Sequence, residues 1–266
     1  MRDLPIGVFD SGVGGLTVLR TLMAALPREH TIYLGDTARV PYGTRSHEVV
    51  TRYALMAGRF LAAQRIKLLV IACNTVSAHS LPALAAALPI PVLGVIEPGA
   101  QAAAASTRGG AIAVLGTPST IASGAYQKAL GRLSPLSPLV ARACPLFVPL
   151  AEEGWVDGEV PRLVAERYLG DLRRSGADTV LLGCTHYPLL SRAIAEVVGP
   201  GVALVDSADA TAEAVLRLLA GRSLLRESGS PAVHRTLCTD LPDRFRGVAE
   251  RFLGRPVGAV ELVDLA

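Results

Sequence analysis

The stretch that decides the fold of this chain is Leu68-Leu-Val-Ile-Ala-Cys73-Asn74-Thr75, and it has a near copy in Val180-Leu-Leu-Gly-Cys184-Thr185-His186. In both, an apolar run of strand length ends at a cysteine that small polar groups follow. Such continuous apolar runs are typical of parallel strands buried on both faces. Ligands of open α/β sheets lie beyond the carboxyl ends of the strands. Two thiols at equivalent strand ends could therefore face one ligand from opposite sides, which suits removal of a proton from one face of a carbon and its return on the other.

Strand-like runs alternate with helix-like segments along the whole chain. The predicted strands are 6–9, 31–34, 68–72, 91–95, 111–115, 139–144, 179–182, 236–238 and 257–263. The predicted helices are 16–26, 46–65, a segment after residue 120, 161–174, 188–198, 208–220 and 241–253, and Ser46 is the expected N-cap of the second. This alternation predicts parallel βαβ units with right-handed crossovers.

The strand pattern restarts near residue 111. Ile6 and Ile112 are separated by nearly the same distance in sequence as Cys73 and Cys184, which indicates two similar halves, either duplicated or convergent. We predict an α/β fold of two similar domains with mainly parallel sheets flanked by helices and the active site in the cleft between them. The first domain is expected to comprise residues 1–97 and 208–266, with the tail packed back on it, and the second residues 98–207.

Composition excludes several classes of protein. The 266 residues are 50% hydrophobic with a net charge of +3, and no basic run interleaved with aromatic residues indicates nucleic-acid binding. The uncharged stretches 68–96 and 109–127 are interrupted by prolines and polar residues, so neither is expected to span a membrane. The N-terminus has no apolar signal-peptide core and runs straight into a strand. A cytosolic protein is expected.

The four cysteines lie far apart, without a Cys-x-x-Cys pair, so neither a disulfide framework nor a structural zinc site is expected. Cys184 and His186 could bind a metal, but no second ligand pair is visible, and we expect none. Only two lysines are present, Lys67 and Lys128, and neither has the setting of a buried Schiff-base lysine. A pyridoxal phosphate enzyme is therefore disfavoured, and no cofactor is expected.

Cys73 and Cys184 are the main candidates for chemistry, because the thiolate is an effective base and a helix N-terminus lowers the pKa of a thiol. Cys144 and Cys238 are expected to be inert core residues. Asp10 follows the first strand and could orient or deprotonate the Cys73 side, or simply cap a loop.

His186 could serve the second thiol or be structural. Glu152 and Glu153 are further acidic candidates; spacing does not choose between them, and both could be solvated loop carboxylates. Ser11-Gly-Val-Gly-Gly15 resembles an anion-binding turn. Asp36 follows the second strand, where a ribose-binding acid could lie, but the glycines do not have the G-x-G-x-x-G spacing of a dinucleotide-binding fold. Other neutral donors are Tyr42, Gly43, Asn74, Thr75, Thr117, Thr120 and Thr185, which could hold a carboxylate or serve as ordinary turn and cap residues.

Taken together, these motifs resemble the cofactor-independent aspartate/glutamate racemase superfamily, and within it the glutamate racemases, over nearly the whole chain. The matching segments are Pro5–Thr17, Leu34–Gly43, Ala72-Cys-Asn-Thr-Val-Ser-Ala78, Gly94–Ala100, Leu115–Thr120 and Leu182-Gly-Cys-Thr-His-Tyr-Pro-Leu-Leu190.

The resemblance implies two facing α/β domains, with Cys73 and Cys184 as catalytic acid/bases, Asp10 and His186 as assisting residues, and Glu152 rather than Glu153 as the acidic residue after the Cys144 run. The implied substrate-binding residues are Asp10, Ser11, Tyr42, Gly43, Asn74, Thr75, Thr185 and His186, with Thr117 and Thr120 as weaker additions. The implied role is interconversion of L- and D-glutamate to supply D-glutamate for peptidoglycan. Homodimers are common in the family, so a homodimer is expected.

Three alternatives remain open from the sequence. The first is a racemase of the same family that acts on aspartate or another small substrate. The second is a non-catalytic amino-acid-binding protein on this scaffold, which would show no exchange at Cα. The third is a thiol redox enzyme, which would need a nearby resolving cysteine, and none is close in sequence.

Overall fold

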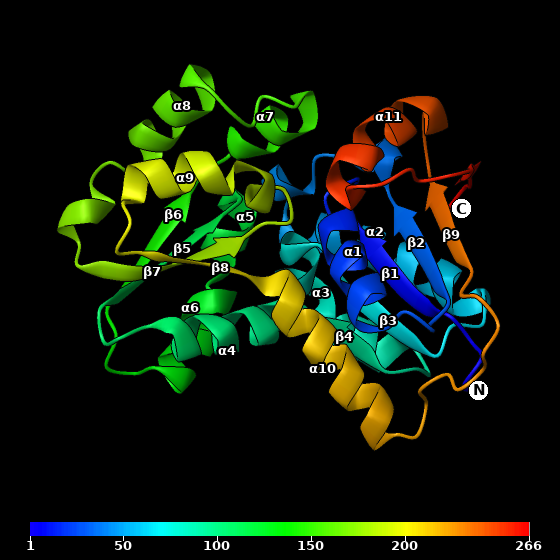
Figure 1. Ribbon diagram of the computed structural model, residues 1–266. Coiled ribbons are helices and arrows are strands. Elements are labelled where there is room, and N and C mark those ends of the chain that lie inside the picture. The colour runs from blue at the N-terminus through cyan, green and yellow to red at the C-terminus, as the bar shows by residue number, and fades with distance from the viewer. Residues whose placement is uncertain (266) are drawn as a thin grey trace.

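The computed structural model describes residues 1–265 and contains two parallel β-sheets with helices on both faces (Figure 1). The six-stranded sheet has the order β10-β9-β2-β1-β3-β4 and the four-stranded sheet the order β6-β5-β7-β8. The strands of the first are β1 (Ile6–Asp10), β2 (Thr31–Gly35), β3 (Leu68–Ile71), β4 (Val92–Gly94), β9 (His234–Cys238) and β10 (Val260–Leu262). Those of the second are β5 (Ala111–Gly116), β6 (Leu139–Ala143), β7 (Ala177–Gly183) and β8 (Ala203–Asp206).

Helices cover both sheets. The longer helices are α1 (Leu16–Ala25), α2 (His47–Ala63), α3 (Asn74–Ala87), α4 (Ile96–Ser106), α6 (Ala125–Leu133), α8 (Glu159–Leu169), α9 (Ser191–Val198), α10 (Ser207–Gly221) and α11 (Pro242–Leu253). Short helical elements are η1 (Thr37–Arg39), η2 (Tyr42–Thr44), α5 (Pro118–Ser123), α7 (Phe147–Glu153), η3 (Leu172–Arg174) and η4 (Tyr187–Leu190). Four hydrophobic clusters form the core, one on each face of each sheet. Within the described residues, the helices are all too short or too polar to cross a membrane.

The predicted alternation of strands and helices is confirmed, and Ser46 caps α2 by accepting a hydrogen bond from the Val49 amide. Two expected helices were wrong in their bounds. The helix expected over 188–198 begins at Ser191, after a 3₁₀ turn. The helix expected over 161–174 ends at Leu169, and a separate 3₁₀ turn follows. Glu152 lies in helix α7 rather than in a loop, because Phe147, Leu150 and Ala151 bury one face of that segment.

The tail after residue 206 returns to the first sheet. β9 pairs in parallel with β2, and β10 pairs with β9. Strands from 6–94 and 234–262 therefore share one sheet, while strands from 111–206 form the other. We propose domain boundaries at 97–98 and 207–208 on this basis.

The carboxyl ends of the central strands meet where the two sheets face each other. A Cβ added to Gly14, after β1, would lie 2.5 Å from the His186 ring, and one added to Gly43 would lie 2.8 Å from Thr117 Cβ. The Thr17 hydroxyl also donates to the Thr185 carbonyl at 3.2 Å. These close approaches bring the polar residues at the two sets of strand ends to one place.

Candidate active site

A cavity of about 400 Å³ lies where the strand ends of the two sheets converge. Its polar lining comes from both halves of the chain: Ser11, Tyr42, Gly43, Thr44, Cys73, Asn74, Thr75, Thr117, Glu152, Cys184, Thr185 and His186. Its apolar wall comprises Val40, Pro41, Pro118, Pro145, Val148 and Pro149. A mainly apolar pocket with a few converging polar groups is the usual form of a small-molecule site.

Cys73 lies at the N-cap of α3 and is buried, with its sulfur 3.4 Å from the Ser11 hydroxyl. Burial, followed by the nearby Asp10 carboxylate, raises the pKa of the Cys73 thiol to about 12. The expectation that the helix N-terminus would lower this pKa was therefore wrong. The reason is that removal from water disfavours the thiolate more than the helix end favours it.

Cys184 begins a charge network that Cys73 lacks. Its sulfur lies 3.8 Å from His186 Nδ1, and His186 Nε2 donates to Glu152 Oε1 at 3.0 Å. Burial alone would lower the pKa of His186, but its hydrogen bonds and charge contacts with Cys184 and Glu152 raise that pKa to about 10. Burial opposes ionisation of Glu152, yet contact with His186 holds the pKa of this carboxyl below its ordinary value. An imidazolium–carboxylate pair at neutral pH follows.

Asp10 lies behind the cavity wall rather than in it. Its side chain is fully buried, one carboxylate oxygen accepts from the Gly12 amide at 2.9 Å, and the other has no partner among residues 1–265. Burial raises the pKa of Asp10, while the His186 charge opposes this. Asp10 is thus placed to act through its charge on the Cys73 thiol and on His186.

Asn74 offers a hydrogen bond that the described part of the protein does not use. Its side-chain oxygen accepts from the Tyr126 hydroxyl at 2.6 Å, whereas its buried Nδ2 has no partner there. Buried donors in native proteins are nearly always paired. Because Asn74 lines the cavity, a ligand with an acceptor such as a carboxylate would complete this site.

A triangle of hydroxyls lies beside Asn74. Thr75 is 3.0 Å from both Thr117 and Thr120, which are 2.9 Å from each other. Thr75 and Thr117 line the cavity, but Thr120 is fully buried behind them. Tyr42 donates its hydroxyl to Asp36 at 2.5 Å, so this tyrosine is held by a second buried group.

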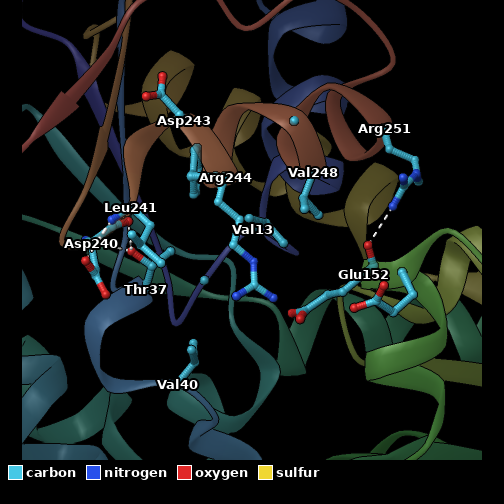
Figure 2. A pocket seen from close by; sticks show the side chains of 14 residues that line it. Val13, Thr37, Val40, Glu152, Asp240, Leu241, Asp243, Arg244, Val248 and Arg251 are labelled. Carbon is cyan, nitrogen blue, oxygen red and sulfur yellow. Dashed lines mark hydrogen bonds between the residues drawn. The ribbon is translucent and has the colours of Figure 1, made fainter.

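Most residues proposed from the sequence thus converge on one cavity, and Asp10 and Thr120 support it from behind. Glu152 contacts His186 and lines this cavity, whereas Glu153 does not. Both glutamates line a neighbouring cavity of about 480 Å³, in which Figure 2 shows Glu152. Cys144 and Cys238 are buried elsewhere. Sequence reasoning missed Phe252, whose ring centroid lies 5.1 Å from that of His186, because no local pattern links the tail to His186. Among residues 1–265 no three side chains form a metal-binding cluster.

The arrangement suits proton transfer at a carbon. Two sulfur atoms from the two sheets line one cavity, and their charges are close enough to interact. One has an imidazolium beside it, and the other is a protonated thiol. A base and an acid on different walls can remove and return a proton without either moving.

Known proteins share this architecture over its full length. Residues 6–215 match the family described as Asp/Glu/Hydantoin racemase. A glutamate racemase of Geobacter metallireducens is 57% identical over 260 residues, which are 98% of this chain and 96% of that protein. The crystal structure of glutamate racemase from Francisella tularensis in complex with D-glutamate has a TM-score of 0.93 at 38% identity and covers 100% of this chain and 99% of that one. A Bacillus anthracis glutamate racemase has a TM-score of 0.95 at 40% identity, with the same coverage.

Proposed function

Because this chain belongs to the Asp/Glu/Hydantoin racemase family, we propose that it is an isomerase that interconverts L-glutamate and D-glutamate without a cofactor. The observation that carries the proposal is the placement of Cys73 and Cys184, from equivalent strand ends of two sheets, in the wall of one cavity. The reaction supplies D-glutamate for peptidoglycan synthesis. We also propose that the protein works in the cytoplasm, whose reducing conditions keep such thiols free. A homodimer is proposed as well, because the family resemblance implies it.

The resting enzyme holds one thiolate and one thiol. The His186 imidazolium, 3.8 Å from the sulfur, attracts a negative charge on Cys184, while burial keeps the proton on Cys73. The Cys184 thiolate removes the proton from Cα of the enantiomer whose Cα–H faces it, and the Cys73 thiol delivers its own proton to the opposite face. The products are the other enantiomer, a Cys184 thiol and a Cys73 thiolate, which is the starting state for the reverse direction.

Carbanionic character at Cα is the main barrier, because a Cα–H is far less acidic than a thiol. We propose that Asn74, Thr75, Thr117 and Thr185 donate to the substrate carboxylates, that Ser11 and Tyr42–Gly43 complete the walls, and that the buried cavity excludes water. Hydrogen bonds that are already in place cost no reorganisation during the reaction. Positioning Cα between the two sulfurs supplies the remaining advantage.

Proton NMR in D₂O tests this proposal. The purified, reduced protein is incubated with L-glutamate without added cofactor, and the product is resolved on a chiral column. We expect loss of the Cα proton signal together with D-glutamate. L-Aspartate, tested in parallel, should react much more slowly; preferential turnover of aspartate would overturn the choice of substrate. A folded, reduced sample that exchanges neither amino acid would overturn racemisation altogether.

A further inference from the structure

The C-terminal helix α11 links the two halves of the molecule at the Cys184 side of the cavity. It packs against α1 and β10 of the first sheet. Two consecutive residues near its end, Arg251 and Phe252, nevertheless contact the residues around Glu152 and His186. Figure 2 shows Arg251 reaching from α11 to Glu152, and Arg244 of the same helix lines the neighbouring cavity described above.

Arg251 holds the end of helix α7. Its guanidinium donates to the Glu152 carbonyl at 2.6 Å and lies 3.4 Å from the Ala151 carbonyl. The last carbonyls of a helix lack partners within the helix and carry partial negative charge. A guanidinium there both donates hydrogen bonds to these carbonyls and balances their charge. The neighbouring Gly154 has a φ of 78°, and a Cβ at that position would lie 2.7 Å from Arg251 Cζ. The glycine thus makes room for the guanidinium.

Phe252 holds the other partner. Its side chain is fully buried, and its ring meets the His186 ring nearly edge to face, with an interplanar angle of 76°. Both nitrogens of His186 are engaged, one with Glu152 and the other with Cys184. An aromatic edge against the ring restricts its rotation without competing for either nitrogen.

The Glu152–His186 contact needs such support. The Glu152 side chain is 42% exposed and comes from a helix of only seven residues. A carboxylate with that freedom gains entropy by turning towards water, and surface ion pairs are correspondingly weak.

We propose that Arg251 and Phe252 are positioning residues, which fix the Glu152 backbone and the His186 ring so that the pair stays aligned on Cys184. This inference rests on the proposed function for its effect on turnover, but not for its effect on His186. The tail of the chain, which belongs to the first sheet, would thereby set the charge network of the second.

The test compares three substitutions on one helix. Arg251 is exposed, so Arg251→Met should fold, and we expect kcat to fall about tenfold with KM little changed, since small misplacements of catalytic groups are costly. Arg251→Lys should recover part of the loss, because the lysine ammonium can still donate to a carbonyl at the end of α7. Arg246→Met is the matched control: Arg246 is also exposed on α11 but pairs with Asp243 instead of α7, and its loss should leave kcat unchanged.

A second readout separates this inference from the proposed function. Imidazole ¹⁵N NMR of His186 should show a lower titration midpoint in Arg251→Met and in Phe252→Leu than in the wild type, and no change in Arg246→Met. If the wild type proves not to be a racemase, these shifts can still be seen, and positioning stands without the activity. An unchanged His186 titration in both Arg251→Met and Phe252→Leu would overturn the positioning role, whatever the activity.

Discussion

The Cys73 and Cys184 sides of the cavity have the same backbone plan but different chemistry. Each cysteine follows a central parallel strand, β3 or β7, at a point where the two sheets face each other. Cys73 has a neutral hydroxyl beside it and a buried acid nearby, and its thiol keeps its proton to high pH. Cys184 has an imidazolium that a carboxylate supports. A repeated fold thus supplies symmetric positions, while local side chains give the two thiols different charged and neutral neighbours.

This difference gives the two sides separate tasks in our account. The Cys184 side holds charge and the Cys73 side stores a proton, while neutral donors from both sides bind the substrate. Since the two glutamate enantiomers have equal free energies in solution, kcat/KM must be equal in both directions. Any asymmetry between the sides can therefore appear only in kcat and KM separately, or in isotope exchange.

The largest expected effect comes from removing either sulfur. Cys73→Ser and Cys184→Ser should each lower racemisation by at least about 10³-fold, because a hydroxyl is a far weaker acid than a thiol, so that it donates its proton poorly and is almost never ionised to act as a base. Chiral chromatography after a long incubation measures the loss, and circular dichroism checks the fold. Appreciable turnover in either variant would show that the corresponding side is not needed.

The next largest effect is expected from the charge network of Glu152, His186 and Cys184. Glu152→Gln should lower kcat about tenfold. It should also move the alkaline limb of the rate profile to lower pH, because His186 loses a partner that raises its pKa. Glu153→Gln is the matched control, since Glu153 lines the neighbouring cavity instead. Equal pH profiles for the two variants would show that contact with Glu152 does not control the charge of His186 beside Cys184.

A smaller effect is expected on the Cys73 side. Asn74→Ala should raise KM about five- to tenfold, the cost of roughly one hydrogen bond to the substrate, and leave the pH profile in place. Initial rates at several pH values measure both quantities. A shifted pH profile with unchanged KM would assign Asn74 to proton chemistry instead of binding.

The smallest effect is on stability. The folded pKa of His186, about 10, exceeds its ordinary value of 6.5, so the native state binds more protons between these values and stability falls as pH rises. The slope should be at most about 1.4 kcal/mol per pH unit. Above pH 9 the raised pKa of Cys73 adds a loss of the same sign. Denaturant unfolding of wild type and His186→Gln between pH 6.5 and 8.5 isolates the histidine, and identical slopes would contradict its raised pKa.

Local patterns were sufficient to predict the strands, the two cysteines and most of the cavity lining. The reason is that a strand ending in a thiol and small polar residues is visible within eight residues, and the carboxyl ends of parallel strands share one edge. Glu152 and Glu153 could not be separated by spacing; the family resemblance favoured Glu152, and α7 directs that residue to His186.

Burial and long-range packing were not predictable in this way. The pKa of Cys73 rises because distant segments close over it, which no helix-end rule includes. Asp10, which the resemblance implies as a substrate-binding residue, is fully buried behind the residues that line the cavity. Phe252 and Arg251 reach the site from a tail that has no motif in common with it. Each of these features depends on how segments far apart in sequence meet.

The most direct test of two unequal sides is Cα deuterium exchange by the single cysteine variants. Each variant, in D₂O, is given L-glutamate and D-glutamate separately, and proton NMR follows the Cα signal. A remaining thiol can exchange the proton of the enantiomer whose Cα–H faces it, so we predict that Cys73→Ser and Cys184→Ser exchange opposite enantiomers without inverting them. Exchange of the same enantiomer by both variants, or of both enantiomers by either one, would contradict a proton path between two opposed thiols.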